Sequence, residues 1–81
     1  MTKTDYTNGH SAVVRMRLVL NGHSLRIAQL GPDFLILREP ADHPPSNAEI
    51  TLVVDGNEER WPVHLSEGIR REYERTPVAK I

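Results

Sequence analysis

The chain has 81 residues, a formal net charge of −1 and no cysteine. This length predicts one domain with a small core, and the absence of cysteine excludes disulfides and thiolate metal sites. No apolar run approaches the roughly 20 residues that cross a bilayer, and the balanced charge gives no general attraction to nucleic acid or to anionic membranes.

The N-terminal stretch, MTKTDYTNGH, is polar and lacks the apolar segment of a secretory signal. We therefore expect residues 1–10 to form a flexible N-terminal lead and residues 11–81 to form a single β domain. We also expect the protein to be cytoplasmic, with no membrane association, and the absence of cysteine is compatible with that reducing compartment.

Residues 11–20 and 24–30 predict two strands joined by a turn at Asn21-Gly22. The Asn-Gly pair favours a type I′ turn, because both central positions need a positive φ. A two-residue loop there places Leu18 opposite Leu25 and Arg17 opposite Arg26, so that the apolar residues of both strands share one face.

The next segment breaks at Gly31-Pro32-Asp33 and then becomes apolar on both faces, as FLIL at residues 34–37. This pattern predicts a short buried strand. Residues 39–47, EPADHPPSN, contain three prolines and no periodicity, which predicts a loop.

The clearest pattern is AEITLVVDGNEERWPVHL at residues 48–65, where apolar and polar residues alternate on both sides of a turn. A loop at Gly56-Asn57 would place Leu52 opposite Trp61 and make the two apolar faces coincide. We then expect Trp61 to be buried against Leu52 and Phe34, and the two aromatic residues to anchor the core.

The C-terminal residues 69–75, IRREYER, predict a short helix or turn, and residues 76–81 predict a last edge strand with a proline at position 77. The sequence leaves open whether this strand pairs within the chain or with a second copy. Together these elements predict an all-β fold: a small antiparallel barrel or rolled sheet of five to six strands with a short C-terminal helix or turn.

Three arginines, Arg15, Arg17 and Arg26, lie on the solvent-facing side of the first two predicted strands. Arginines directly opposite each other repel unless an acid lies near. One interpretation is a solvated face balanced by Glu49 or Glu58. The other is a patch that binds an anion or an acidic partner.

No residue pattern indicates catalysis or metal binding. The four histidines, His10, His23, His43 and His64, form no paired ligand motif, and no serine lies in a nucleophile motif. We expect no enzymatic activity, no metal and no cofactor. The few aromatic residues offer no platform for base stacking, which disfavours a nucleic-acid partner.

Residues 30–65 resemble the second half of a PilZ domain, in which a glycine-containing turn, a short apolar strand and a polar loop precede a long hairpin. The matching stretches are LGPDFLILREP, ADHPPSNAE and ITLVVDGNEERWPVHL. The resemblance implies a six-stranded β-barrel, and many PilZ domains bind cyclic di-GMP through R-x-x-x-R and D/N-x-S-x-x-G motifs. The N-terminal lead has no R-x-x-x-R motif, since Arg15 and Arg17 lie two residues apart, and the D/N-x-S-x-x-G motif is absent, so we expect no cyclic di-GMP binding.

These observations predict a non-catalytic binding module. Its partner would be another protein or a second copy of the chain, held through a sheet face or a sheet edge. The alternative is a degenerate PilZ-like module that binds an anion or a nucleotide through Arg15, Arg17 and Arg26.

Overall fold

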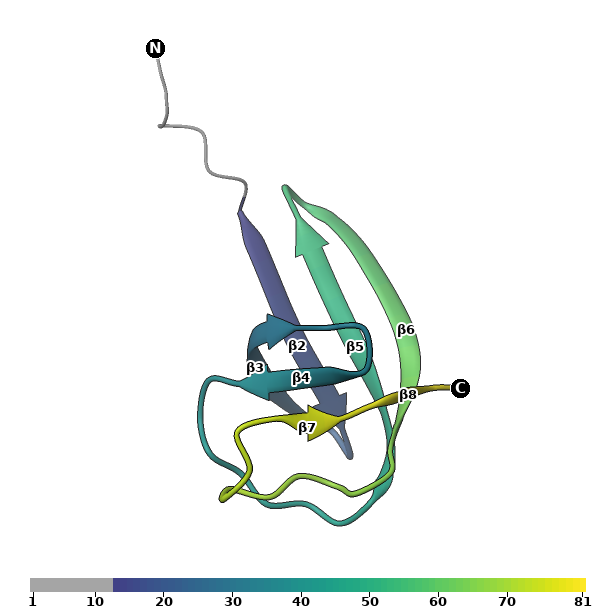
Figure 1. Ribbon diagram of the computed structural model, residues 1–81. Helices are drawn as coiled ribbons and strands as arrows, with labels where there is room; N and C mark the ends of the chain where they lie inside the picture. Colours follow the sequence, from purple (N-terminus) through teal and green to yellow (C-terminus); the bar gives the residue numbers. More distant parts are fainter. Residues whose placement is uncertain (1–12) are drawn as a thin grey trace.

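The computed structural model describes residues 13–81, and every regular element in this part is a β-strand (Figure 1). The predicted lead at residues 1–10 lies outside the described residues. The strands are β2 (Val14–Leu20), β3 (His23–Leu30), β4 (Phe34–Leu37), β5 (Ser46–Val54), β6 (Asn57–Leu65), β7 (Thr76–Pro77) and β8 (Ala79–Lys80). They pair in the order β7-β4-β3-β2-β5-β6-β8, and all pairs are antiparallel.

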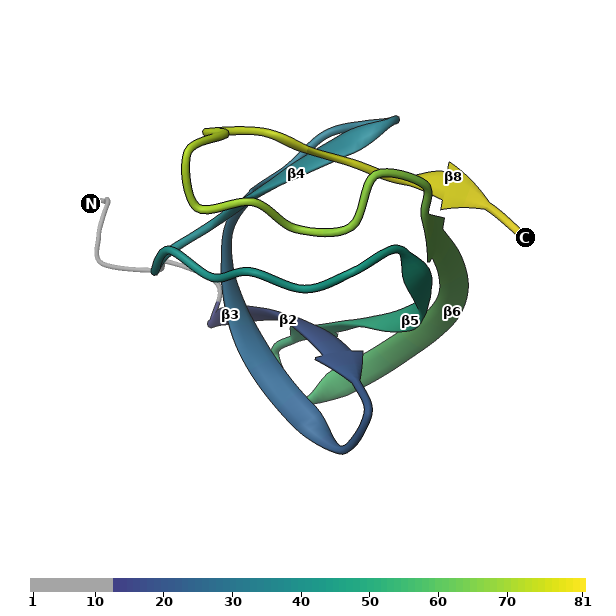
Figure 2. The same cartoon turned by 90° about the horizontal axis from the view of Figure 1, so that it is seen from below.

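The sheet is nearly closed into a barrel, because its two outermost strands are consecutive in the chain. β7 pairs with β4 and β8 pairs with β6, so residues 76–80 join the two ends of the sheet (Figures 1 and 2). This confirms the all-β prediction. The seven strands exceed the predicted five to six because the last strand is divided at Val78, whose N–H donates to the Asp33 carbonyl at 3.0 Å.

The first hairpin has the predicted register. Leu18 lies opposite Leu25 and Arg17 opposite Arg26. Asn21 and Gly22 have φ values of 48° and 77°, as a type I′ turn requires. The alternation also holds, since Leu18 and Leu20 are buried, whereas Arg17 and Val19 are more exposed.

The loop of the second hairpin was predicted one residue too late. It is formed by Asp55 and Gly56, with φ values of 50° and 86°, so Ile50 rather than Leu52 lies opposite Trp61. The error moves each partner by two residues and therefore leaves every side chain on its predicted face. Asp-Gly has the same left-handed preference as Asn-Gly, and this decides the position of the turn.

The buried core of the described residues is entirely aliphatic. It contains Leu18, Leu20, Ile27, Leu35, Ile50, Val63, Leu65 and Ile69. Phe34 and Trp61 are only half-buried, so the expectation that they anchor the core is wrong. The Phe34 ring packs on Gly31 and lies 4.4 Å from the Arg75 guanidinium, while Trp61 packs at the margin of the core. In so narrow a barrel, branched aliphatic side chains fill the interior.

The segment predicted as a short helix or turn, residues 69–75, contains turns and no helix. Ile69 is buried and exchanges backbone hydrogen bonds with His43 across the gap between two loops. Arg71 binds Asp42 in the same loop instead of a helical neighbour. A helix this short is marginal by itself, so these tertiary contacts decide the conformation.

The C-terminal strand pairs within its own chain, which answers the question that the sequence left open. Leu35 lies opposite Thr76 on one side, and Val63 lies opposite Lys80 on the other. Thr76 is only 4% exposed, so this segment is an integral part of the barrel.

Candidate functional site

A shallow groove opens where β2 and β3 diverge. Their pairing runs from Leu20–His23 to Arg17–Arg26; beyond it β2 continues along β5, whereas β3 turns away to pair with β4. An irregularity between Ile27 and Gln29 accompanies this turn. The space between the strands has a volume of about 470 Å³ and is lined by Val14, Arg15, Met16, Arg17, Arg26, Ile27, Ala28 and Arg38. We call it the arginine groove.

All three arginines predicted from the sequence line this groove, and a fourth joins them. Arg38 follows β4, and its backbone N–H donates to the Arg26 carbonyl at 3.0 Å, which holds it beside β3. Sequence reasoning missed Arg38 because it did not pair the short FLIL strand with a neighbour. The observed pairing of Ile27 with Leu37 brings Arg38 to the groove.

The expected acidic counterparts of the groove are located elsewhere. Glu49 and Glu58 lie 4.0 Å and 2.8 Å from Arg60 on β6. Arg26 instead pairs with Glu39 at 3.0 Å, and both side chains are more than half exposed. Such an exposed pair contributes little stability and leaves both groups accessible.

The remaining guanidinium groups of the groove keep their positive charge available. Arg17 donates to the Ser24 hydroxyl at 3.2 Å. Within residues 13–81, no carboxylate lies within 4.0 Å of a guanidinium nitrogen of Arg15, Arg17 or Arg38. Within the described part of the chain, four cations with one paired carboxylate make the groove electropositive, although the net charge of the full sequence is −1.

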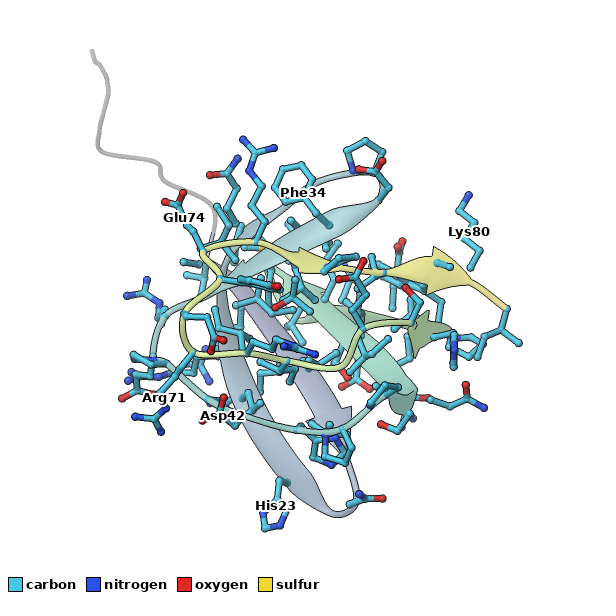
Figure 3. All side chains as sticks on the ribbon, turned by 60° about the horizontal axis from the view of Figure 1, so that its bottom comes forward. His23, Phe34, Asp42, Arg71, Glu74 and Lys80 are labelled. Atoms are coloured by element: carbon cyan, nitrogen blue, oxygen red, sulfur yellow. The ribbon has the colours of Figure 1, made fainter. Side chains whose placement is uncertain are left out.

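A second polar cluster joins the two loops below the barrel, where Figure 3 shows Asp42 beside Arg71. The Asp42 carboxylate accepts the Arg71 backbone N–H at 3.0 Å and its Nε at 2.7 Å. These two hydrogen bonds, the backbone one first, lower the pKa of Asp42. Because Asp42 and Arg71 bind each other, we infer that this pair stabilises the contact between the two loops.

Two of the three described histidines, His43 and His64, make separate hydrogen bonds rather than forming a shared site. His43 Nδ1 donates to the Pro44 carbonyl at 2.7 Å and its Nε2 accepts from Asn21, while His64 Nδ1 donates to Asn47 at 2.8 Å. Across residues 13–81, no three His, Cys, Asp or Glu side chains gather as metal ligands.

No protein-family model, curated protein or solved structure matches this chain. The resemblance of residues 30–65 to PilZ domains therefore stays a prediction. The described part of the chain also has no helix that is long and apolar enough to cross a membrane.

Proposed function

We propose that this chain is a non-catalytic binding module for another protein, and that the arginine groove receives an acidic, extended segment of that partner. The observation that carries the proposal is the convergence of Arg15, Arg17, Arg26 and Arg38 on one groove in which, among residues 13–81, a single carboxylate is paired with them. Guanidinium groups bind carboxylates through paired, charge-assisted hydrogen bonds, and an acidic peptide supplies such carboxylates at regular spacing.

The backbone beside the groove favours an extended ligand. β2 pairs with β5 as far as Val14–Val54, but its pairing with β3 ends at Arg17–Arg26. Among the described residues, no strand pairs with the other edge of residues 14–16. An extended peptide can add to such an edge through main-chain hydrogen bonds.

The side chains of the groove specify the composition of that peptide. Arg15 and Arg17 lie two residues apart on one face of β2, a separation of about 7 Å along a strand. Carboxylates at alternate positions of an added strand have the same spacing. Val14, Met16 and Ile27 line the groove between the arginines and offer apolar contact to the intervening residues.

The alternative ligand is an anionic small molecule or a nucleotide, held by the same four arginines. The lining of the groove contains no aromatic side chain on which a base could stack. It also contains no nucleophile and no general base, which supports binding rather than catalysis.

A fluorescence anisotropy titration tests the proposal. The probe is a labelled peptide with glutamates at alternate positions separated by valines, measured at low and at high salt. We expect saturable binding that weakens with salt, and a loss of about tenfold or more in the Arg15→Gln/Arg17→Gln double variant. Arg60→Gln is the matched control, because it removes an exposed arginine from the outer face of β6.

Equal binding by the wild-type chain and the double variant would refute the role of the groove. Saturable binding of cyclic di-GMP that displaces the peptide would favour the nucleotide alternative instead. Failure of both ligands to bind at low salt would overturn the proposed function.

A further inference from the structure

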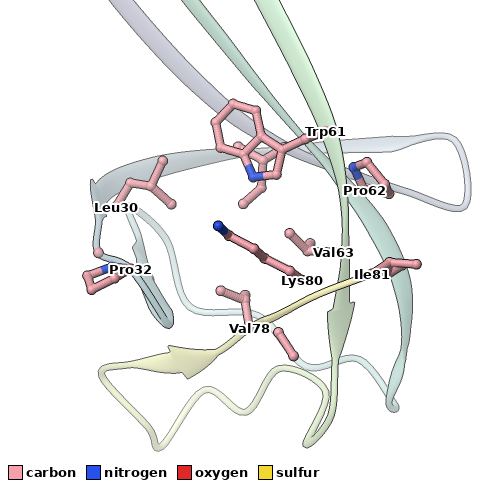
Figure 4. A pocket seen from close by; sticks show the side chains of 11 residues that line it. Leu30, Pro32, Trp61, Pro62, Val63, Val78, Lys80 and Ile81 are labelled. Atoms are coloured by element: carbon pink, nitrogen blue, oxygen red, sulfur yellow. The ribbon is translucent and has the colours of Figure 1, made fainter.

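A second groove lies at the seam where the C-terminal strand closes the barrel, away from the arginine groove. It has a volume of about 520 Å³, within the range of small-molecule sites in proteins. Its walls come from the end of β3 and the turn after it, from β6, and from β7–β8, and they include Leu30, Pro32, Trp61, Val78, Lys80 and Ile81 (Figure 4). We call it the seam groove.

The walls of the seam groove are almost entirely apolar and are largely preformed. Ile50 and Val63 form its floor and belong to the buried core. Trp61 packs on that core, and Pro32 and Pro62, which have little side-chain freedom, lie at the margins. A ligand that enters such a site loses little binding energy to the ordering of the protein.

Among the described residues that line the seam groove, Lys80 has the only charged side chain. Figure 4 shows its side chain in front of the groove, and Figure 3 shows it projecting outward from β8. Lys80 is exposed, so its stem borders the apolar walls while the ammonium group stays in water at the mouth of the groove, where the charged end of a ligand would lie. Within residues 13–81, no carboxylate lies within 4.0 Å of it.

We propose that the seam groove binds an amphiphilic monocarboxylate, a medium-chain fatty acid. The carboxylate pairs with the Lys80 ammonium, and the alkyl chain packs against Trp61, Leu30 and Val78. The single cation requires one negative charge, and the continuous apolar walls require an apolar body. A flexible alkyl chain suits a groove that is open along one side. This site is independent of the arginine groove and of the function proposed for it.

Trp61 makes the inference directly measurable, because it is the only tryptophan of the chain and lies in the groove. The probe is decanoate, added below the concentration at which it forms micelles. We expect a saturable shift of the tryptophan emission to shorter wavelength. Lys80→Gln should weaken decanoate binding about fivefold or more. Arg70→Gln, which removes an exposed arginine outside both grooves, is the matched control and should bind decanoate like the wild type.

Charge reversal sharpens the test. Lys80 is exposed and pairs with Val63 through its backbone, so its substitution leaves the fold intact, as far-ultraviolet circular dichroism would verify. Lys80→Glu should reject decanoate and bind decylamine instead. Decanol, which has the same chain without the charge, should bind the wild type several-fold more weakly than decanoate.

Three results would overturn the inference. The first is no saturable change with decanoate by either tryptophan emission or calorimetry. The second is equal decanoate affinity in the wild type and in Lys80→Gln, and the third is decanol binding as tight as that of decanoate. None of these results would bear on the function proposed for the arginine groove, because the two sites share no residue.

Discussion

Single residues with left-handed backbone conformations determine where this chain turns. Asn21-Gly22 and Asp55-Gly56 both have positive φ at two consecutive positions, and each joins two paired strands. Gly68 also has a positive φ, of 67°, but it lies between loops rather than in a hairpin. An alanine at Gly68 would be destabilised both by the positive φ and by close backbone neighbours, so comparing it with an alanine at an open glycine separates the two effects.

The first prediction compares Gly68→Ala with Gly22→Ala. A Cβ at Gly68 would collide with the His43 carbonyl oxygen and would lie 2.8 Å from the Pro44 carbonyl carbon, whereas a Cβ at Gly22 meets open space. Gly22→Ala should therefore cost only about 1 kcal/mol, for the backbone conformation. Gly68→Ala should cost roughly 3 kcal/mol or more, because the backbone of the proline loop must also move. Urea denaturation measures both, and equal costs would contradict the described packing.

The second prediction concerns Asp42, whose pKa is held below its ordinary value of 3.8 by the backbone N–H and then the guanidinium of Arg71. The unfolded chain binds this proton more readily, so the contact stabilises the fold above about pH 4 and is lost as the pH falls through the native pKa. Asp42→Asn should lower the Tm at about pH 6, and the difference from the wild type should shrink toward about pH 2.5. Asp33→Asn is the control. A difference that is unchanged or larger in acid would contradict the role of the pair.

The sequence predicts the strands and hairpin turns, because these depend on local alternation of apolar and polar residues and on the residues in the turns. The strands β2 to β6 and the register of the first hairpin follow from those signals. The incorrect predictions concern segments whose conformation depends on contacts between residues far apart in the sequence. Residues 69–75 form turns because Ile69 and Arg71 are held by a loop almost thirty residues earlier in the chain.

For the candidate site too, local patterns predict some residues, whereas others depend on contacts between distant parts of the chain. Arg15, Arg17 and Arg26 were found because two paired strands place them on one solvent-facing side. Arg38 was missed because its position depends on the pairing of β3 with β4, which is interrupted by an irregularity that no sequence signal marks. The half-exposed position of Trp61 depends on how the C-terminal strand closes the barrel, and alternation alone contains no such information.

The third prediction tests that closure. Deleting residues 76–81 should unfold the chain or reduce its stability severely, because it removes the partners of both β4 and β6 and the buried Thr76. Circular dichroism and urea denaturation provide the measurement. A truncated chain that unfolds in the wild-type concentration range of urea would show that β7 and β8 are dispensable.

For the whole molecule, the topology separates two surfaces of different chemistry. The divergence of β2 from β3 opens the arginine groove, and the incomplete closure beside β6 and β8 opens the seam groove. Both follow from bending a sheet of few strands until its ends nearly meet. The two binding functions that we propose therefore belong to two chemically distinct surfaces.

The fourth prediction is that the chain binds neither zinc nor cyclic di-GMP at micromolar concentration. His43 and His64 bond to separate partners, the D/N-x-S-x-x-G motif is missing from the sequence, and the N-terminal lead has no R-x-x-x-R motif. Isothermal titration calorimetry with each ligand is the measurement. Saturable heat with zinc would reveal a site outside the described clusters. Saturable heat with cyclic di-GMP would favour nucleotide binding over protein binding as the function of the arginine groove.

Chemical-shift mapping of the acidic peptide on the isotopically labelled chain is the sharpest test of our proposal that the arginine groove binds a protein partner. We predict that the perturbed amides cluster at residues 14–17, 26–28 and 38, which line the groove. The perturbations should be largest along the open edge of β2 and should disappear in the Arg15→Gln/Arg17→Gln double variant. Perturbations confined to the outer face of β5 and β6, or to the seam groove, would contradict the account.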